Sequence, residues 1–139
     1  MNYWLVKSEP DTFSWNDLVT LGRDMWNGVR NYQARNNLMA MTLDDLVLFY
    51  HSVKNPGVVG IAKVVSTHYP DPTSPDDPRW VVVDLAPEQA LEQKVSLASI
   101  KQQPELAGML LLRQSRLSVM PVTTAEFHTI VQMGKLTVK

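Results

Sequence analysis

Short apolar runs separated by polar turns dominate the hydrophobic pattern of this chain. The aromatic and β-branched run at Tyr3–Val6 predicts a buried strand. Two β-rich runs, at 46–52 and 58–66, flank a Lys-Asn-Pro-Gly turn, and this arrangement predicts a hairpin. The run WVVVDL at 80–85 and the alternating pattern at 116–122 predict two more strands. The pattern therefore predicts a sheet of short strands.

Helix signals fall between these strands. Capping boxes at 14–17 (Ser to Asp) and at 123–126 (Thr to Glu) start two predicted helices, which Gly22 and Gly134 end. Further helical segments are expected at 31–41, at 96–102 and after Pro104. Strands at both ends of the chain, with helices between them, predict an α+β fold with a small, strongly bent sheet or a partly closed barrel.

Composition narrows the class of protein. The 139 residues suffice for one domain, expected at 1–134, with a C-terminal tail at 135–139. Hydrophobic residues make up 45% of the chain, yet no apolar run could span a bilayer, and the N-terminus lacks a secretory signal. With no cysteine, disulfides and thiolate metal sites are excluded. We therefore expect a cytoplasmic protein without membrane association.

The distribution of charge is more informative than the net charge of −1. No Asp or Glu lies between Met25 and Leu43, a segment that contains Arg30. None lies between 106 and 125 either, where Arg113 and Arg116 occur. A nearly neutral protein with two such basic segments can bind one anionic ligand locally, although it is not suited to coating nucleic acid.

The sequence contains no evident catalytic or cofactor motif. Its three histidines show no metal-ligand spacing, and its six glycines form neither a dinucleotide-binding nor a phosphate-binding loop. His51 and Ser52 are neighbours on a predicted strand, so their side chains should point to opposite faces. We therefore expect no metal and no cofactor. An enzyme would have to use His51 with Glu9 or Asp11.

The segment WNGVRNYQARN at 26–36 is rich in nitrogen donors and has no carboxylate. Trp26 is either a plug in the core or the wall of a ligand cage. Arg30 can bind phosphate or pair with a carboxylate elsewhere in the fold. Asn31 stands where a helix would begin and can cap it. Other fragments add aromatic, hydroxyl and guanidinium groups, which together suit an unstacked base. Those groups belong to Phe49, Tyr50, His51, Ser52, Arg79, Trp80, Arg113, Ser115 and Arg116.

Several long motifs resemble the EVE domain family in the same order along the chain. They are YWLVKSEPDTFSWNDL, WNGVRNYQARNNLMAM, DLVLFYHSVKNPGVVGIAKVV, YPDP, PRWVVVD and LLRQSRLSVMPVT. The resemblance covers roughly residues 1–134. One departure is the proline- and aspartate-rich loop at 69–79, which is shorter than in many members of that family.

The resemblance implies a PUA-like fold, a small mixed barrel-like sheet flanked by short helices. It also implies a non-catalytic module that binds nucleic acid, DNA or RNA, and recognises a modified base, with 5-substituted cytosine as the first candidate. The implied base pocket would contain Ser8, Trp26, Val29, Asn31, Tyr50, His51, Ser52 and Trp80. The implied basic rim, which would contact phosphate, would contain Lys7, Arg30, Arg79, Arg113 and Arg116.

Two other functions stay open on the residues alone. One is an enzyme acting on nucleic acid or on a small anionic substrate, with His51 at its centre. The other is a protein-interaction module whose basic rim binds an acidic partner. A deep pocket would favour base recognition, whereas a broad exposed apolar patch would favour protein binding.

Overall fold

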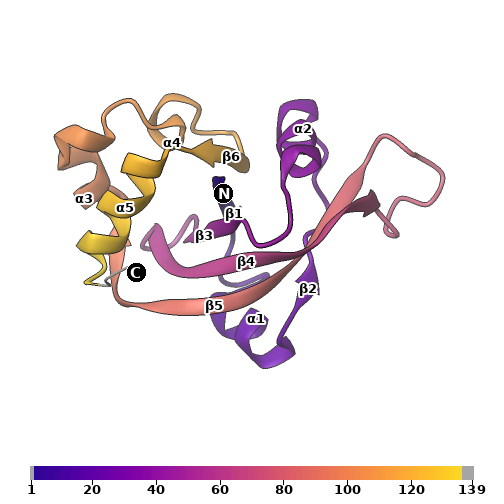
Figure 1. Ribbon diagram of the computed structural model, residues 1–139, viewed down its shortest axis with the longest axis horizontal. Helices are drawn as coiled ribbons and strands as arrows, with labels where there is room; N and C mark the ends of the chain where they lie inside the picture. Colours follow the sequence, from indigo (N-terminus) through magenta and orange to yellow (C-terminus); the bar gives the residue numbers. More distant parts are fainter. Residues whose placement is uncertain (1, 136–139) are drawn as a thin grey trace.

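A computed structural model describes residues 2–135 of the protein, and its strands form one sheet (Figure 1). The strand order in this six-stranded sheet is β2-β5-β4-β3-β1-β6. The strands are β1 (Tyr3–Ser8), β2 (Asp24–Met25), β3 (Leu46–His51), β4 (Gly57–Pro70), β5 (Val81–Ser96) and β6 (Val119–Val122). The helices are α1 (Trp15–Leu21), α2 (Tyr32–Ala40), α3 (Leu97–Gln102), the 3-10 helix η1 (Pro104–Leu106), α4 (Leu110–Arg113) and α5 (Thr124–Met133).

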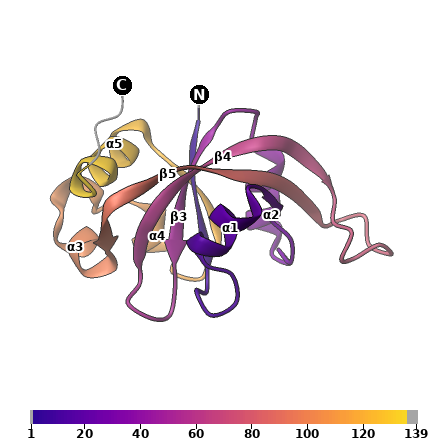
Figure 2. The ribbon, with the colours of Figure 1, turned by 90° about the horizontal axis from the view of Figure 1, so that it is seen from below.

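The sheet is mixed and strongly bent (Figure 2). β1 and β3 are parallel, whereas the other strand pairs are antiparallel. Parallel neighbours need a long crossover connection, and here α1, β2 and α2 form it. β4 and β5 make a long twisted hairpin whose register shifts at several points, as β-bulges produce. These shifts bend the hairpin around the core.

Aromatic packing on β3 and β4 forms the part of the core nearest the crossover. The Phe49 ring is fully buried, and the Trp15 ring meets it edge to face with 5.4 Å between centroids. Gly60 on β4 lets the Trp15 ring lie against the strand, because a Cβ there would come within 2.7 Å of the ring. The start of α1 is thereby fixed against the sheet.

The structure confirms the α+β class and both capping boxes. The Ser14 side chain accepts a hydrogen bond from the Asp17 N–H, and the Thr123 side chain accepts one from the Glu126 N–H. The sheet has one strand more than expected, because β2 has only two residues. β5 also continues far beyond the predicted end at residue 85, to Ser96.

Two sequence expectations concern the limits of the domain and membrane association. The assignment of residues 1–134 to a single domain stays a prediction, and the expected tail lies, after Lys135, outside the described residues. Among residues 2–135, no helix has the length and apolar character needed to cross a membrane.

Candidate functional site

A hollow of about 510 Å³ opens beside Trp26, where the end of β1 meets the connection between β2 and α2. We call it the Trp26 pocket. Its walls come from the end of β1, from the segment that follows β1, and from residues 24–27 on the other side of α1 in the sequence. It is lined by Lys7, Ser8, Glu9, Thr12, Phe13, Asp24, Met25, Trp26 and Asn27.

Trp26 belongs to the hydrophobic core and also lines the pocket. Its exposed fraction is 9%, and its ring meets Phe13 and Phe49 edge to face at centroid distances of 6.1 and 5.5 Å. Its backbone N–H donates to the Val83 carbonyl oxygen, which extends the β2–β5 pairing by one residue. The two alternatives for this residue therefore coexist: the indole packs into the core and presents part of its surface to the hollow.

Polar groups also line the Trp26 pocket. Lys7 reaches across the surface and donates from Nζ to the Ser115 carbonyl oxygen at 2.7 Å. Partial burial lowers the pKa of Lys7, because the charged form loses hydration there. Glu9 and Asp24 contribute carboxylates, and Ser8 donates its hydroxyl proton to the Phe13 carbonyl oxygen. The pocket thus combines an aromatic face with both acceptors and a cation.

A second hollow, of about 340 Å³, lies beyond Lys7. We call it the arginine groove. Arg113 and Arg116 are exposed, and within residues 2–135 neither forms an ion pair with a carboxylate. The bond from Lys7 to Ser115 joins the groove to the Trp26 pocket. The groove is lined by Asn31, Gln33, Arg113, Gln114, Ser115, Arg116 and Leu117.

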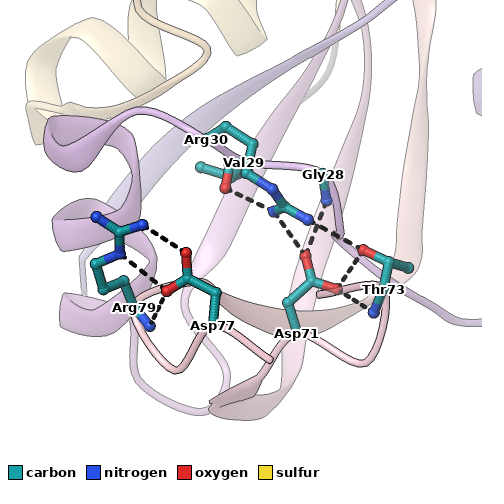
Figure 3. Close-up of polar contacts among 7 residues, drawn as sticks. All are labelled: Gly28, Val29, Arg30, Asp71, Thr73, Asp77 and Arg79. Carbon is teal, nitrogen blue, oxygen red and sulfur yellow. Dashed lines mark hydrogen bonds and ion pairs between the residues drawn. The ribbon is translucent and has the colours of Figure 1, made fainter. Parts of the chain in front are cut away.

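Arg30 is engaged by a buried carboxylate at the tip of the β4–β5 hairpin (Figure 3). Asp71 accepts hydrogen bonds from Arg30 at 3.0 Å, from the Gly28 N–H at 3.1 Å, and from the Thr73 N–H and hydroxyl at 2.7 and 2.6 Å. Gly28 has φ 78°, a left-handed conformation that glycine adopts without strain. Burial acts to raise the pKa of Asp71, but the bonds from Thr73, Arg30 and Gly28 outweigh it and lower the pKa to about 2.

Arg79 and Trp80 belong to the same hairpin tip. Arg79 donates to both carboxylate oxygens of Asp77, and its Nη1 donates to the Tyr32 hydroxyl at 2.9 Å. The Trp80 ring is tilted against Tyr32, with 5.3 Å between centroids. The guanidinium groups of Arg30 and Arg79 lie 5.7 and 5.6 Å from the Trp80 centroid. Trp80 therefore packs against a cluster that holds the hairpin tip on α2.

Tyr50, His51 and Ser52 lie at the end of β3 and just after it, where β3 pairs with Lys7 and Ser8 of β1. Tyr50 is buried, with Lys7 Nζ 5.9 Å from its ring centroid. His51 Nε2 accepts a hydrogen bond from the Trp15 N–H at 3.0 Å, and burial, aided by the charge of Lys94, lowers the pKa of His51. The neutral imidazole thus serves as a backbone acceptor at the start of α1.

The structure brings together only part of the set of residues expected from the sequence. Ser8, Trp26 and Lys7 line the Trp26 pocket, and Asn31, Arg113 and Arg116 line the arginine groove. Val29 is buried in the core, and Arg30, Arg79 and Trp80 pack at the hairpin tip. Five pocket residues have no distinctive residue type or pattern in the sequence: Thr12, Phe13, Asp24, Met25 and Asn27. Two of them directly precede Trp26 and one follows it. This nearness to Trp26 is the only feature of the sequence that could have indicated them.

Within the described part of the chain, no group of three or more His, Asp or Glu side chains is placed to hold a metal ion. Carboxylates in this region are bound by arginine or by backbone N–H groups. Asp71 pairs with Arg30 and the Gly28 N–H, and Asp77 pairs with Arg79.

Comparison with known proteins finds relatives that match nearly the whole chain. A family model described as the EVE domain matches residues 2–133. Mouse (Mus musculus) thymocyte nuclear protein 1 is 38% identical over 165 aligned residues, which cover 95% of this chain and 73% of that protein. A crystal structure of a protein from Agrobacterium tumefaciens has a TM-score of 0.96 at 44% identity, covering 98% of this chain and 94% of the other.

A third relative has been crystallised with nucleic acid. The crystal structure of the human THYN1 protein in complex with DNA containing 5-methylcytosine has a TM-score of 0.92 at 33% identity, covering 99% of this chain and all of the other. Together these similarities confirm the family that the sequence motifs indicated, and its PUA-like α+β fold.

Proposed function

The chain belongs to the EVE domain family, and we propose that it is a non-catalytic module that binds DNA and recognises a 5-substituted cytosine. The proposal rests first on the Trp26 pocket, because an indole and polar groups that line one hollow are what a base swung out of its stack requires. The human relative crystallised with DNA containing 5-methylcytosine suggests which base this is.

The chemistry of the pocket suits cytosine. The exposed part of Trp26 offers a stacking surface, and Phe13 and Met25 offer apolar surface for a 5-methyl group. Glu9 and Asp24 carry carboxylates, which accept hydrogen bonds from the exocyclic amino group of cytosine and which thymine cannot match. In this proposal these two acids read the edge of the base while Trp26 holds its face.

The geometry at His51 does not favour the alternative of an enzyme. The Nε2 lone pair that a general base would use already accepts the Trp15 N–H. Asp11, which that alternative would pair with His51, forms an ion pair with Lys54 at 2.8 Å. We therefore propose a reader without its own catalysis. We keep a cytoplasmic location as part of this proposal, although the mouse relative is named a nuclear protein.

The proposal is tested by titrating labelled oligonucleotides that carry cytosine, 5-methylcytosine, thymine or N6-methyladenine at one position, in DNA and in RNA. We expect the 5-methylcytosine DNA to bind most tightly. Trp26→Leu, which keeps an apolar side chain in the core, should remove about 1–3 kcal/mol of binding free energy by losing the stacked face. Equal, negligible binding to every oligonucleotide would contradict the proposal. Preferential binding to the RNA oligonucleotides would show that the ligand is RNA and not DNA.

Folding of the variant has to be measured beside binding. Trp26→Leu must show a cooperative unfolding transition like that of the wild type, because Trp26 also packs against Phe49. Phe13→Leu is a matched control, since it removes a ring that lines the same pocket but meets Trp26 only edge to face. A folded Trp26→Leu protein that still distinguishes the four oligonucleotides would show that Trp26 is a core residue alone.

A further inference from the structure

The loop between β3 and β4 presents an apolar side chain on a strained backbone. Val53 has an exposed fraction of 72% and a φ of 72°. The Lys54 N–H donates to the Ser52 carbonyl oxygen at 2.9 Å, which makes Val53 the apex of a three-residue γ-turn. A β-branched residue with positive φ is a genuine outlier, because its Cβ substituents crowd the backbone. Val53 is not buried in the core, and the γ-turn does not need a β-branched residue, so neither accounts for a valine at this position.

This turn is fastened to the rim of the Trp26 pocket at two points. The Ser52 N–H donates to the Ser8 carbonyl oxygen at 2.9 Å, and Ser8 lines the pocket. On the other side of Val53, Lys54 pairs with Asp11 at 2.8 Å, within the segment that joins the lining residues Glu9 and Thr12. The loop between β3 and β4 and the segment after β1 lie next to each other in Figure 2. Val53 is thus exposed to solvent, and the residues on either side of it are bonded to the segment that lines the pocket.

We infer that Val53 is a wedge that enters the base stack of duplex DNA when the target base occupies the Trp26 pocket. Proteins that open a duplex commonly insert an apolar side chain between base steps, because the vacated space otherwise leaves stacked surface exposed to water. The strained turn holds that side chain outward before DNA arrives, so little ordering remains to be done on binding. This inference rests on the proposed function, since it needs a base that leaves its duplex.

Loss of the Val53 side chain should affect binding to duplex DNA but not binding to single-stranded DNA. A wedge contributes only where a stack must be opened, so Val53→Gly should weaken binding to a duplex carrying one 5-methylcytosine by about tenfold, the effect of losing one buried valine side chain. Binding of the same strand without its complement should stay unchanged. A 2-aminopurine placed beside the target base should brighten when the wild type binds the duplex, and brighten less with Val53→Gly.

Two further variants control for the backbone of the loop. Asn55 is exposed and has φ 44°, so Asn55→Gly changes a second left-handed residue of the same loop without removing an apolar side chain. It should bind the duplex as the wild type does. Val53→Leu keeps an apolar side chain and should retain most of the duplex affinity. Val53→Gly should unfold at no lower denaturant concentration than the wild type, because glycine relieves the strain at φ 72°.

The outcomes of these measurements are distinct. If the wild type binds duplex and single strand but Val53→Gly weakens neither, or weakens both equally, the wedge is refuted and the proposed function stands. If Asn55→Gly weakens duplex binding as much as Val53→Gly does, the loop backbone is responsible and the wedge is again refuted. If the wild type binds no oligonucleotide with 5-methylcytosine, the proposed function fails and the wedge fails with it.

Discussion

Two arginine-bearing regions flank the Trp26 pocket, and they differ in what their guanidinium groups contact. At the hairpin tip, Arg30 and Arg79 are bound to Asp71 and Asp77. In the arginine groove, Arg113 and its neighbour at 116 are exposed and form no ion pair within the described residues. The first two arginines are thus occupied by carboxylates, one of them buried, whereas the second two are available for an anion.

The difference has a simple cause in the distribution of acids. The segment after β4 brings Asp71 against Arg30, which lies in a basic stretch with no acid of its own. In the same segment, Asp77 pairs with Arg79 two residues further along the chain. The segment from 106 to 125 has no acid, and among residues 2–135 no other segment brings a carboxylate into an ion pair with its arginines. The two arginines of the groove therefore present positive charge on the Lys7 side of the Trp26 pocket. A phosphate backbone would be attracted to that side.

The variant with the largest expected effect removes the Asp71 carboxylate at the tip of the β4–β5 hairpin. Asp71→Ala leaves Arg30, Thr73 and the Gly28 N–H without their acceptor. We expect a loss of about 3 kcal/mol in the free energy of unfolding, the usual cost of removing one partner of a buried charged pair. Denaturant unfolding measures it. Asp77→Ala is the control, and its loss should be much smaller, because the pair with Arg79 is on the surface.

A loss as small as that of Asp77→Ala would contradict the structural role assigned to Asp71. The cluster would then be a surface feature like any other exposed ion pair. Arg30 would also become a candidate for binding phosphate, and the comparison between the two regions would lose its basis.

The pH dependence of stability gives a second, smaller test at the same residue. The folded pKa of Asp71 is about 2, below its ordinary value of 3.8, so ionisation of this carboxyl group favours the folded state. The contribution, about 2 kcal/mol, is complete above the unfolded pKa and is lost as pH falls from about 4 through 2. The unfolding free energies of the wild type and of Asp71→Asn should therefore converge over that window. A constant difference between them from pH 6 to pH 2.5 would show that Asp71 is not the titrating group.

The sequence predicted the local parts of this fold better than the distant ones. Ser14 and Asn31 could be assigned as helix caps because a capping hydrogen bond spans three residues and is visible in the local pattern. The second half of β5 could not be predicted as a strand, because the segment from Glu88 to Lys94 is mostly polar and exposed. Its pairing with β4 comes from backbone hydrogen bonds. Apolar periodicity does not report such a strand.

The candidate site shows the same limit. The fragments around Trp26 and Arg113 were singled out for their residue types, and both line hollows. No local signal could separate Arg30 from Arg113, because the partner of Arg30 is Asp71, more than forty residues away. Whether an arginine holds the fold or faces a ligand depends on where acids arrive in space.

The smallest expected effect concerns DNA binding by the exposed arginines of the groove, measured as the salt dependence of affinity. Arg113→Ala/Arg116→Ala should reduce the slope of log affinity against log salt by about 1.4–1.8, because two phosphate contacts are lost. The loss of affinity should be equal for cytosine and 5-methylcytosine, since phosphate contacts carry no base information.

A double variant that removes the same charge provides the matched control. In Arg23→Ala/Arg79→Ala, both arginines come from pairs, with Asp84 and Asp77 at 2.7 and 2.6 Å. The net charge therefore changes by the same amount, but no cation in the arginine groove is lost. If the groove is the phosphate-binding side, this variant should leave the salt slope nearly unchanged. Equal slopes for the two double variants would mean that DNA senses only the total charge of the protein. The asymmetry around the Trp26 pocket would then have no part in binding.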